Sequence, residues 1–108
     1  MEPALPEAIE RYFTAENVGD AEALAACFTD DATVLDEGRS MEGPAAIKQW
    51  MIEAKAKYRH TAEPLKVVLE DGRTVVTAKV SGKFPGSPVE LAHAFTLDGD
   101  RIAALEIG

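Results

Sequence analysis

The stretch that decides the fold runs from residue 8 to residue 36 and reads AIERYFTAENVGDAEALAACFTDDATVLD. Apolar side chains recur in its first part at the spacing of one helix face, and Tyr12 lies on that face. Gly19 is placed to end this helix, and Asp20 to cap a second, short one. The last four residues start with a β-branched side chain and predict a short strand that ends in Asp36. A tyrosine and an aspartate can therefore point into one cavity.

The rest of the chain predicts one more helix and then a run of strands. The second helix should end near residue 28, and Gly43 and Pro44 predict the start of a third, whose apolar stripe reaches Tyr58. The period then changes to two, which predicts strands over residues 60–70, 73–84, 89–97 and 101–107. Pro64 places the first of these at a sheet edge or at a bulge. Helices on one side of a curved antiparallel sheet make one α+β domain over residues 1–108.

The charge balance excludes several classes of partner. Eleven basic and nineteen acidic residues give a net charge of −8, and no cluster of Lys or Arg reverses it locally. This argues against a nucleic-acid partner, because binding to a phosphate backbone needs basic side chains. No apolar run approaches the ~20 residues that span a bilayer, and the amino terminus lacks a signal-peptide pattern. We therefore expect a cytoplasmic protein without membrane contact, in which the single cysteine, Cys27, is a small buried thiol.

The block of residues 8–36 resembles the opening of the cone-shaped domains of the nuclear transport factor 2-like (NTF2-like) superfamily, ketosteroid isomerases and SnoaL-like polyketide cyclases included. Tyr12 falls on the oxyanion-hole tyrosine of the isomerases, and Asp36 falls on their general base. Matching residues that build the fold are Asn17, Gly19, Asp20, Phe28, Asp30, Asp31, Ala32, Val34 and the segment 43–47. The resemblance implies a cone-shaped, NTF2-like (cystatin-like) fold, with three N-terminal helices packed on a strongly curved antiparallel sheet and a cavity at its open end.

His93 takes the place of the protonated aspartate that completes the isomerase site, if the turn before the last strand is used as the anchor. Strand parity predicts that His93 points inward, because it shares one strand face with the apolar residues Leu91 and Phe95, two positions before and after it. A neutral imidazole N–H can donate to an enolate oxygen, so the resemblance implies a catalytic set of Asp36, Tyr12 and His93. The alternatives are structural: a core tyrosine, a turn aspartate and a core histidine.

Five further side chains are candidates for contact with a substrate: Trp50 and Tyr58 on the stripe of the third helix, His60 just after it, Phe28 and Phe95. For Trp50 and Tyr58 the alternative is packing beneath the sheet, and for His60 it is capping the helix end. The turn at residues 84–88, which contains two prolines, is either a rigid hairpin or a lip of the pocket or a dimer contact.

Other chemistries find no support in the sequence. Two histidines 33 positions apart and one cysteine give no metal-ligand spacing, and the glycines fall singly at turns rather than in a phosphate loop. We therefore expect no metal and no cofactor. The resemblance implies a pocket for a small, apolar carbonyl compound and an isomerase or cyclase that removes a proton next to the carbonyl. The alternative is a non-catalytic ligand-binding or accessory domain. Either should form a homodimer through the open face of the sheet.

Overall fold

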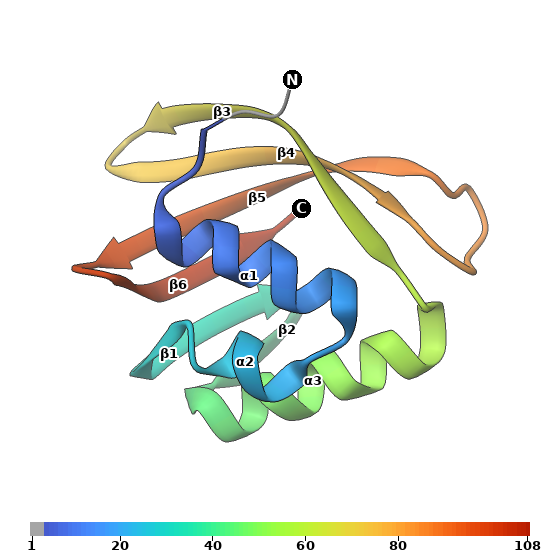
Figure 1. Ribbon diagram of the computed structural model, residues 1–108, viewed down its shortest axis with the longest axis horizontal. Helices are drawn as coiled ribbons and strands as arrows, with labels where there is room; N and C mark the ends of the chain where they lie inside the picture. The colour runs from blue at the N-terminus through green and yellow to red at the C-terminus, as the bar shows by residue number, and fades with distance from the viewer. Residues whose placement is uncertain (1–3) are drawn as a thin grey trace.

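Six strands form one sheet, and three helices lie along one of its faces in the computed structural model, which describes residues 4–108 (Figure 1). The helices are α1 (Glu7–Val18), α2 (Ala21–Ala25) and α3 (Gly43–Tyr58). The strands are β1 (Phe28–Asp36), β2 (Arg39–Glu42), β3 (Thr61–Glu70), β4 (Arg73–Ser81), β5 (Val89–Asp98) and β6 (Arg101–Ile107). The predicted α+β architecture, with three N-terminal helices packed on one sheet, is confirmed.

The strands follow the order β2-β1-β6-β5-β4-β3. The predicted meander of β3 to β6 is antiparallel throughout, whereas β1 runs parallel to β6 at the other side of the sheet. Pro64 lies on the edge strand β3 at a register shift, as its missing N–H requires. Asp71 and Gly72 form the hairpin turn before β4, both with positive φ angles of 54° and 77°.

Three predicted boundaries are wrong, and one of them is the end of β4, which lies at Ser81 rather than at residue 84. The second helix ends at Ala25 rather than near residue 28, and β1 begins at Phe28 rather than at residue 33. The polar residues 29–31 carry no strand pattern, so the sequence does not predict the first part of β1. This part forms because Phe28 pairs with Ile102 of β6. The segment Arg39–Glu42 has no apolar alternation and therefore no strand signal of its own. Its pairing with the end of β1 makes it the strand β2.

The core lies between the helices and the inward face of the sheet. Its centre is a group of aromatic rings, in which Tyr12 makes edge-to-face contacts with Phe13, Phe28 and Phe95 at centroid distances of 5.1, 6.0 and 5.4 Å. Such pairs stabilise a core beyond the area that they bury. Cys27 is buried, as expected. No helix in residues 4–108 is long and apolar enough to cross a membrane.

Asn17 fastens the end of α1 to the start of β3. Its Nδ2 donates to the Ala62 carbonyl at 2.8 Å, and its Oδ1 accepts from the Ala62 N–H at 2.7 Å. Gly82 allows the same region to pack closely, because a Cβ there would lie 2.7 Å from the Tyr58 carbonyl oxygen. These contacts fix residues 58–62, which join α3 to β3.

Asn17→Ala should lower the free energy of unfolding by about 2 kcal/mol, because it removes two hydrogen bonds of about 1 kcal/mol each. Urea denaturation measures the change. Gln49→Ala is the control, since it breaks an exposed bond to Glu53 within one helix face and should cost less than about 0.5 kcal/mol. Equal losses in the two variants would contradict the fastening role of Asn17.

Candidate functional site

A cavity of about 390 Å³ opens between α3 and the inward face of the sheet, next to the loop that joins β4 to β5. Its wall takes residues from every part of the chain, from the end of α1 to the end of β6. The lining residues are Glu16, Asp36, Glu37, Trp50, Ala54, Tyr58, His60, Val80, Phe84, Pro85, Val89, Leu91, His93 and Ile107. A mostly apolar cavity with a few polar groups is typical of a small-molecule site.

Asp36 ends β1 on the wall of this cavity, and its side chain is half-buried. Trp50, on the buried stripe of α3, donates from its indole Nε1 to Asp36 Oδ2 at 3.1 Å. Burial raises the pKa of the Asp36 carboxyl above its ordinary value, and the Trp50 hydrogen bond offsets part of this rise by stabilising the carboxylate. A carboxyl whose pKa is moved toward neutrality can both accept and return a proton.

His93 points inward from β5, as strand parity predicts, and is 2% exposed. Its Nδ1 lies 3.2 Å from the Leu91 carbonyl oxygen, and because a carbonyl can only accept, Nδ1 carries the proton. Burial lowers the pKa of the imidazole, which favours the neutral ring. The N–H of that ring is already engaged, so Nε2 is an acceptor. This differs from the expected role of His93 as a donor to an enolate oxygen.

Glu16 is a site residue that the sequence reasoning did not assign. It lines the cavity from α1 and forms a buried pair with His60, with 2.9 Å between Oε2 and Nε2. Glu16 Oε1 and His60 Nδ1 have no hydrogen-bond partner among the described residues. The available signal was a glutamate on the apolar stripe of its helix, beside Ile9, Tyr12 and Phe13. His60, predicted to contact the substrate, lies in the lining.

Aromatic rings form another part of the wall. Trp50 and Tyr58, which were predicted to contact the substrate, line the cavity together with Phe84. The Tyr58 hydroxyl donates to Glu37 Oε1 at 3.2 Å, and its ring meets Phe84 edge-to-face at 5.8 Å. Phe84 and Pro85 bring the turn after β4 into the wall, so the lip interpretation of this turn is the one that the structure favours.

Tyr12, Phe28 and Phe95 lie in the aromatic core and are not among the lining residues. Phe28 and Phe95 were expected to contact the substrate. In the structure they pack against Tyr12 instead. The Tyr12 hydroxyl has no hydrogen-bond partner among the described residues. Burial, followed by the charges of Glu16 and Asp36, raises the pKa of Tyr12 well above its ordinary value. Its predicted catalytic role stays a prediction.

In the described part of the chain, no group of three or more His, Cys, Asp or Glu side chains is arranged to hold a metal ion. The polar groups of the cavity can instead move protons and hold polar atoms of a ligand. The fold and this cavity define a class: a cone-shaped α+β domain with a ligand-sized pocket between its long helix and its sheet.

A family model, the SnoaL-like domain, matches residues 9–105. The protein therefore belongs to the SnoaL-like domain family, within the NTF2-like superfamily. None of the curated proteins compared with it matches the chain.

Solved structures resemble the chain over nearly its whole length. A Sinorhizobium meliloti protein, provisionally named a polyketide cyclase, is 44% identical with a TM-score of 0.92, covering 96% of this chain and 95% of its own. A Catenulispora acidiphila protein with a ketosteroid isomerase-like fold, solved with trimethylamine, is 20% identical with a TM-score of 0.85, covering 97% and 86%. SalBIII, an epoxide hydrolase/cyclase-like enzyme of pyran-ring formation in salinomycin, is 22% identical with a TM-score of 0.78, covering 94% and 86%. The last two show a shared fold alone.

Tyr12→Phe should leave the free energy of unfolding unchanged or raise it by about 1 kcal/mol, because a buried hydroxyl without a partner costs free energy in the folded state. Thermal and urea denaturation measure this change. Tyr58→Phe, which removes a hydroxyl bonded at the surface to Glu37, is the matched control and should not stabilise. A loss of more than about 1 kcal/mol in Tyr12→Phe would show that the hydroxyl has a partner in solution.

Proposed function

We propose that this SnoaL-like protein is an enzyme that removes a proton next to the carbonyl of a small, largely apolar compound, with Asp36 as the base. The observation that carries the proposal is the half-buried Asp36 carboxyl with a raised pKa on the wall of a cavity of about 390 Å³. The Trp50 hydrogen bond holds one carboxyl oxygen and leaves the other to accept the proton. A provisionally named polyketide cyclase as a relative fits a carbonyl substrate.

In this reaction Asp36 takes the proton, the C–H electron pair forms a carbon–carbon double bond, and the carbonyl oxygen becomes an enolate oxygen. An isomerase returns the proton from Asp36 to another carbon. In a cyclase the enolate carbon attacks a second carbonyl carbon, and the oxygen of that carbonyl takes the proton from Asp36. Stabilising the enolate oxygen is the largest demand on the site. Because the His93 N–H is engaged by Leu91, we assign that donation to Tyr12, whose hydroxyl has no hydrogen-bond partner in residues 4–108, and make His93 Nε2 an acceptor for the substrate. Substrate binding must then open access to Tyr12.

The second candidate function is ligand binding without turnover. The same cavity supports it, since apolar walls from Val80, Val89 and Leu91 can enclose a small molecule without any chemistry. A shared fold does not transfer activity. A thermal-shift screen of small ketones, phenols and steroid-like compounds, followed by assays of the compounds that bind, separates the two. Binding without proton exchange at the carbon next to the carbonyl favours this candidate over the enzyme.

Asp36→Asn should lower turnover by about 10²- to 10⁴-fold, the usual contribution of a general base. Deuterium exchange into a bound ketone, followed by NMR, measures it. The variant should also unfold at a higher temperature at pH 7, because burial raises the pKa of Asp36 and ionisation of this carboxyl therefore costs folding free energy. This difference should disappear below the ordinary pKa of aspartate, 3.8, where Asp36 is protonated in both the folded and the unfolded chain.

Asp98→Asn is the matched control, because Asp98 is also an aspartate at the end of a strand, β5, but is exposed and does not line the cavity. It should leave both turnover and the unfolding temperature unchanged. If Asp36→Asn exchanges deuterium as fast as the wild type, Asp36 is not the base.

We also propose that two copies associate through the outward face of the sheet, opposite the helices. Thr74, Val76 and Ala78 point into the core, so the alternate residues of β4 point outward. There Val75 pairs with Val68 and Ala94, and Thr77 pairs with Ala92, which makes a flat patch of small and β-branched side chains. Such a face is suited to pack against a second copy.

Light scattering at micromolar concentration should give twice the mass of one chain. Val75→Arg should produce a folded monomer, because Val75 lies between Val68 and Ala94 in the patch and a charge there would be desolvated in the dimer. A wild-type monomer would contradict the proposal, and so would a dimer that Val75→Arg leaves intact.

A further inference from the structure

The ionisable groups in the cavity wall are unbalanced in sign. Among the residues that the structure describes, three carboxylates line it, from Glu16, Asp36 and Glu37, and no lysine or arginine does. The basic side chains of this wall are two histidines. Burial lowers the pKa of His93, which keeps that ring neutral, and His60 is paired with Glu16. A ligand with a phosphate or carboxylate group would meet like charges here, which is unfavourable.

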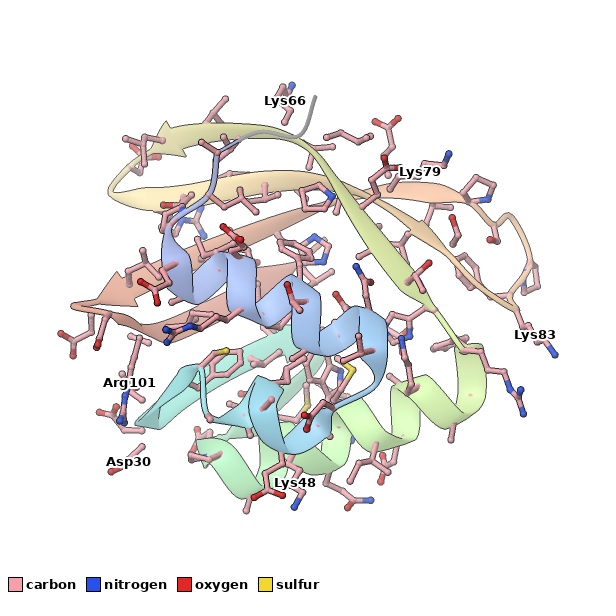
Figure 2. All side chains as sticks on the ribbon, viewed as in Figure 1. Asp30, Lys48, Lys66, Lys79, Lys83 and Arg101 are labelled. Atoms are coloured by element: carbon pink, nitrogen blue, oxygen red, sulfur yellow. The ribbon has the colours of Figure 1, made fainter. Side chains whose placement is uncertain are left out.

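The nearby lysines are engaged or point elsewhere. Lys55 Nζ donates to the backbone carbonyl of His60, and Lys57 Nζ lies 5.0 Å from the centroid of the Tyr58 ring without lining the cavity. Lys83, next to Phe84 in sequence, projects away from the molecule (Figure 2). Lys55 and Lys57 offset part of the charge of Glu16 and Glu37, whereas no lysine or arginine is among the groups that shift the pKa of Asp36.

The same wall carries three aromatic rings, Trp50, Tyr58 and Phe84. Two of them donate hydrogen bonds to carboxylates, Trp50 to Asp36 at 3.1 Å and Tyr58 to Glu37 at 3.2 Å. Rings and carboxylates are therefore neighbours in the cavity. Aromatic faces attract cations, most strongly where water is excluded, and a carboxylate beside them supplies the opposite charge.

Glu16 adds an independent observation. Its side chain is 4% exposed and lies in the cavity wall, yet Oε1 has no hydrogen-bond partner among the described residues. A buried carboxylate with an unpaired oxygen is costly, and a cation in the cavity would reduce that cost.

We propose that the ligand of this cavity carries a tertiary or quaternary ammonium group on an apolar skeleton. Trp50, Tyr58 and Phe84 surround the ammonium group, and Asp36 and Glu37 supply the opposite charge. This inference rests on the proposed function to the extent that both use the same cavity, and it names the substrate class. An ammonium group near Asp36 would also favour the carboxylate form, which is the one that accepts a proton.

The test compares choline with 3,3-dimethylbutan-1-ol, which have the same shape and differ in the exchange of a charged nitrogen for carbon. Trp50 is the single tryptophan of the chain, so its fluorescence and its indole N–H signal report directly on the cavity. Choline should bind at least ~10-fold more tightly than the neutral alcohol, in line with a desolvated cation–π contact.

Phe84→Leu and Glu37→Gln should each reduce the preference for choline, whereas Glu90→Gln, an exposed residue on the outward side of β5, should not. Equal or tighter binding of the neutral alcohol would overturn the inference, and so would a preference for choline that survives both cavity substitutions. Ketone exchange by Asp36 is measured separately. Deuterium exchange without a preference for choline would support the proposed function and contradict this inference. A preference for choline without deuterium exchange would support this inference and contradict the proposed function.

Discussion

The hydrogen bond from the Trp50 indole to the Asp36 carboxylate joins the long helix α3 to the end of β1. Trp50 belongs to the buried stripe of its helix, with Ile47 and Met51, so the indole cannot move away without opening the core. The Asp36 carboxyl is therefore held half-buried in a fixed orientation, in which it forms part of the cavity wall. On a solvated loop the same side chain would keep its ordinary pKa; here burial raises it. The chemistry that we assign to the protein depends on this one contact between helix and strand.

The site also holds groups that stability alone would not select. A half-buried carboxyl, a buried Glu16–His60 pair and a buried tyrosine hydroxyl without a partner among the described residues all cost folding free energy. The aromatic core beside them, with Tyr12 packed against Phe28 and Phe95, offsets that cost through dense edge-to-face packing. Departures of this kind from good packing are typical of functional sites, where the surrounding structure supports what the local chemistry needs.

Much of the fold could be predicted, because its signals are local. Gly19 adopts a positive φ of 77° at the end of α1, and the Asp20 side chain accepts from the Ala23 N–H at 3.0 Å, as their positions in the sequence indicated. The meander of strands followed from period-two alternation and turn residues. The strand β2 and the first part of β1 could not be predicted, because their polar residues form strands through pairing with distant segments rather than through a pattern of their own.

The sequence by itself determined the buried stripe of the third helix and the inward face of the strand that carries His93, since a period of 3.6 or 2 is a property of neighbouring residues. It thereby identified His93 and Trp50 as inward-facing candidates, whereas Asp36 became a candidate through the resemblance of residues 8–36 to a known family. Only the tertiary structure decided how deep each inward side chain lies, leaving Phe95 in the core and Leu91, on the same strand face, in the cavity wall. It also decided the pairing of Glu16 with His60, 44 residues apart. Depth and pairing depend on the curvature and register of segments far apart in the chain, which no local pattern encodes.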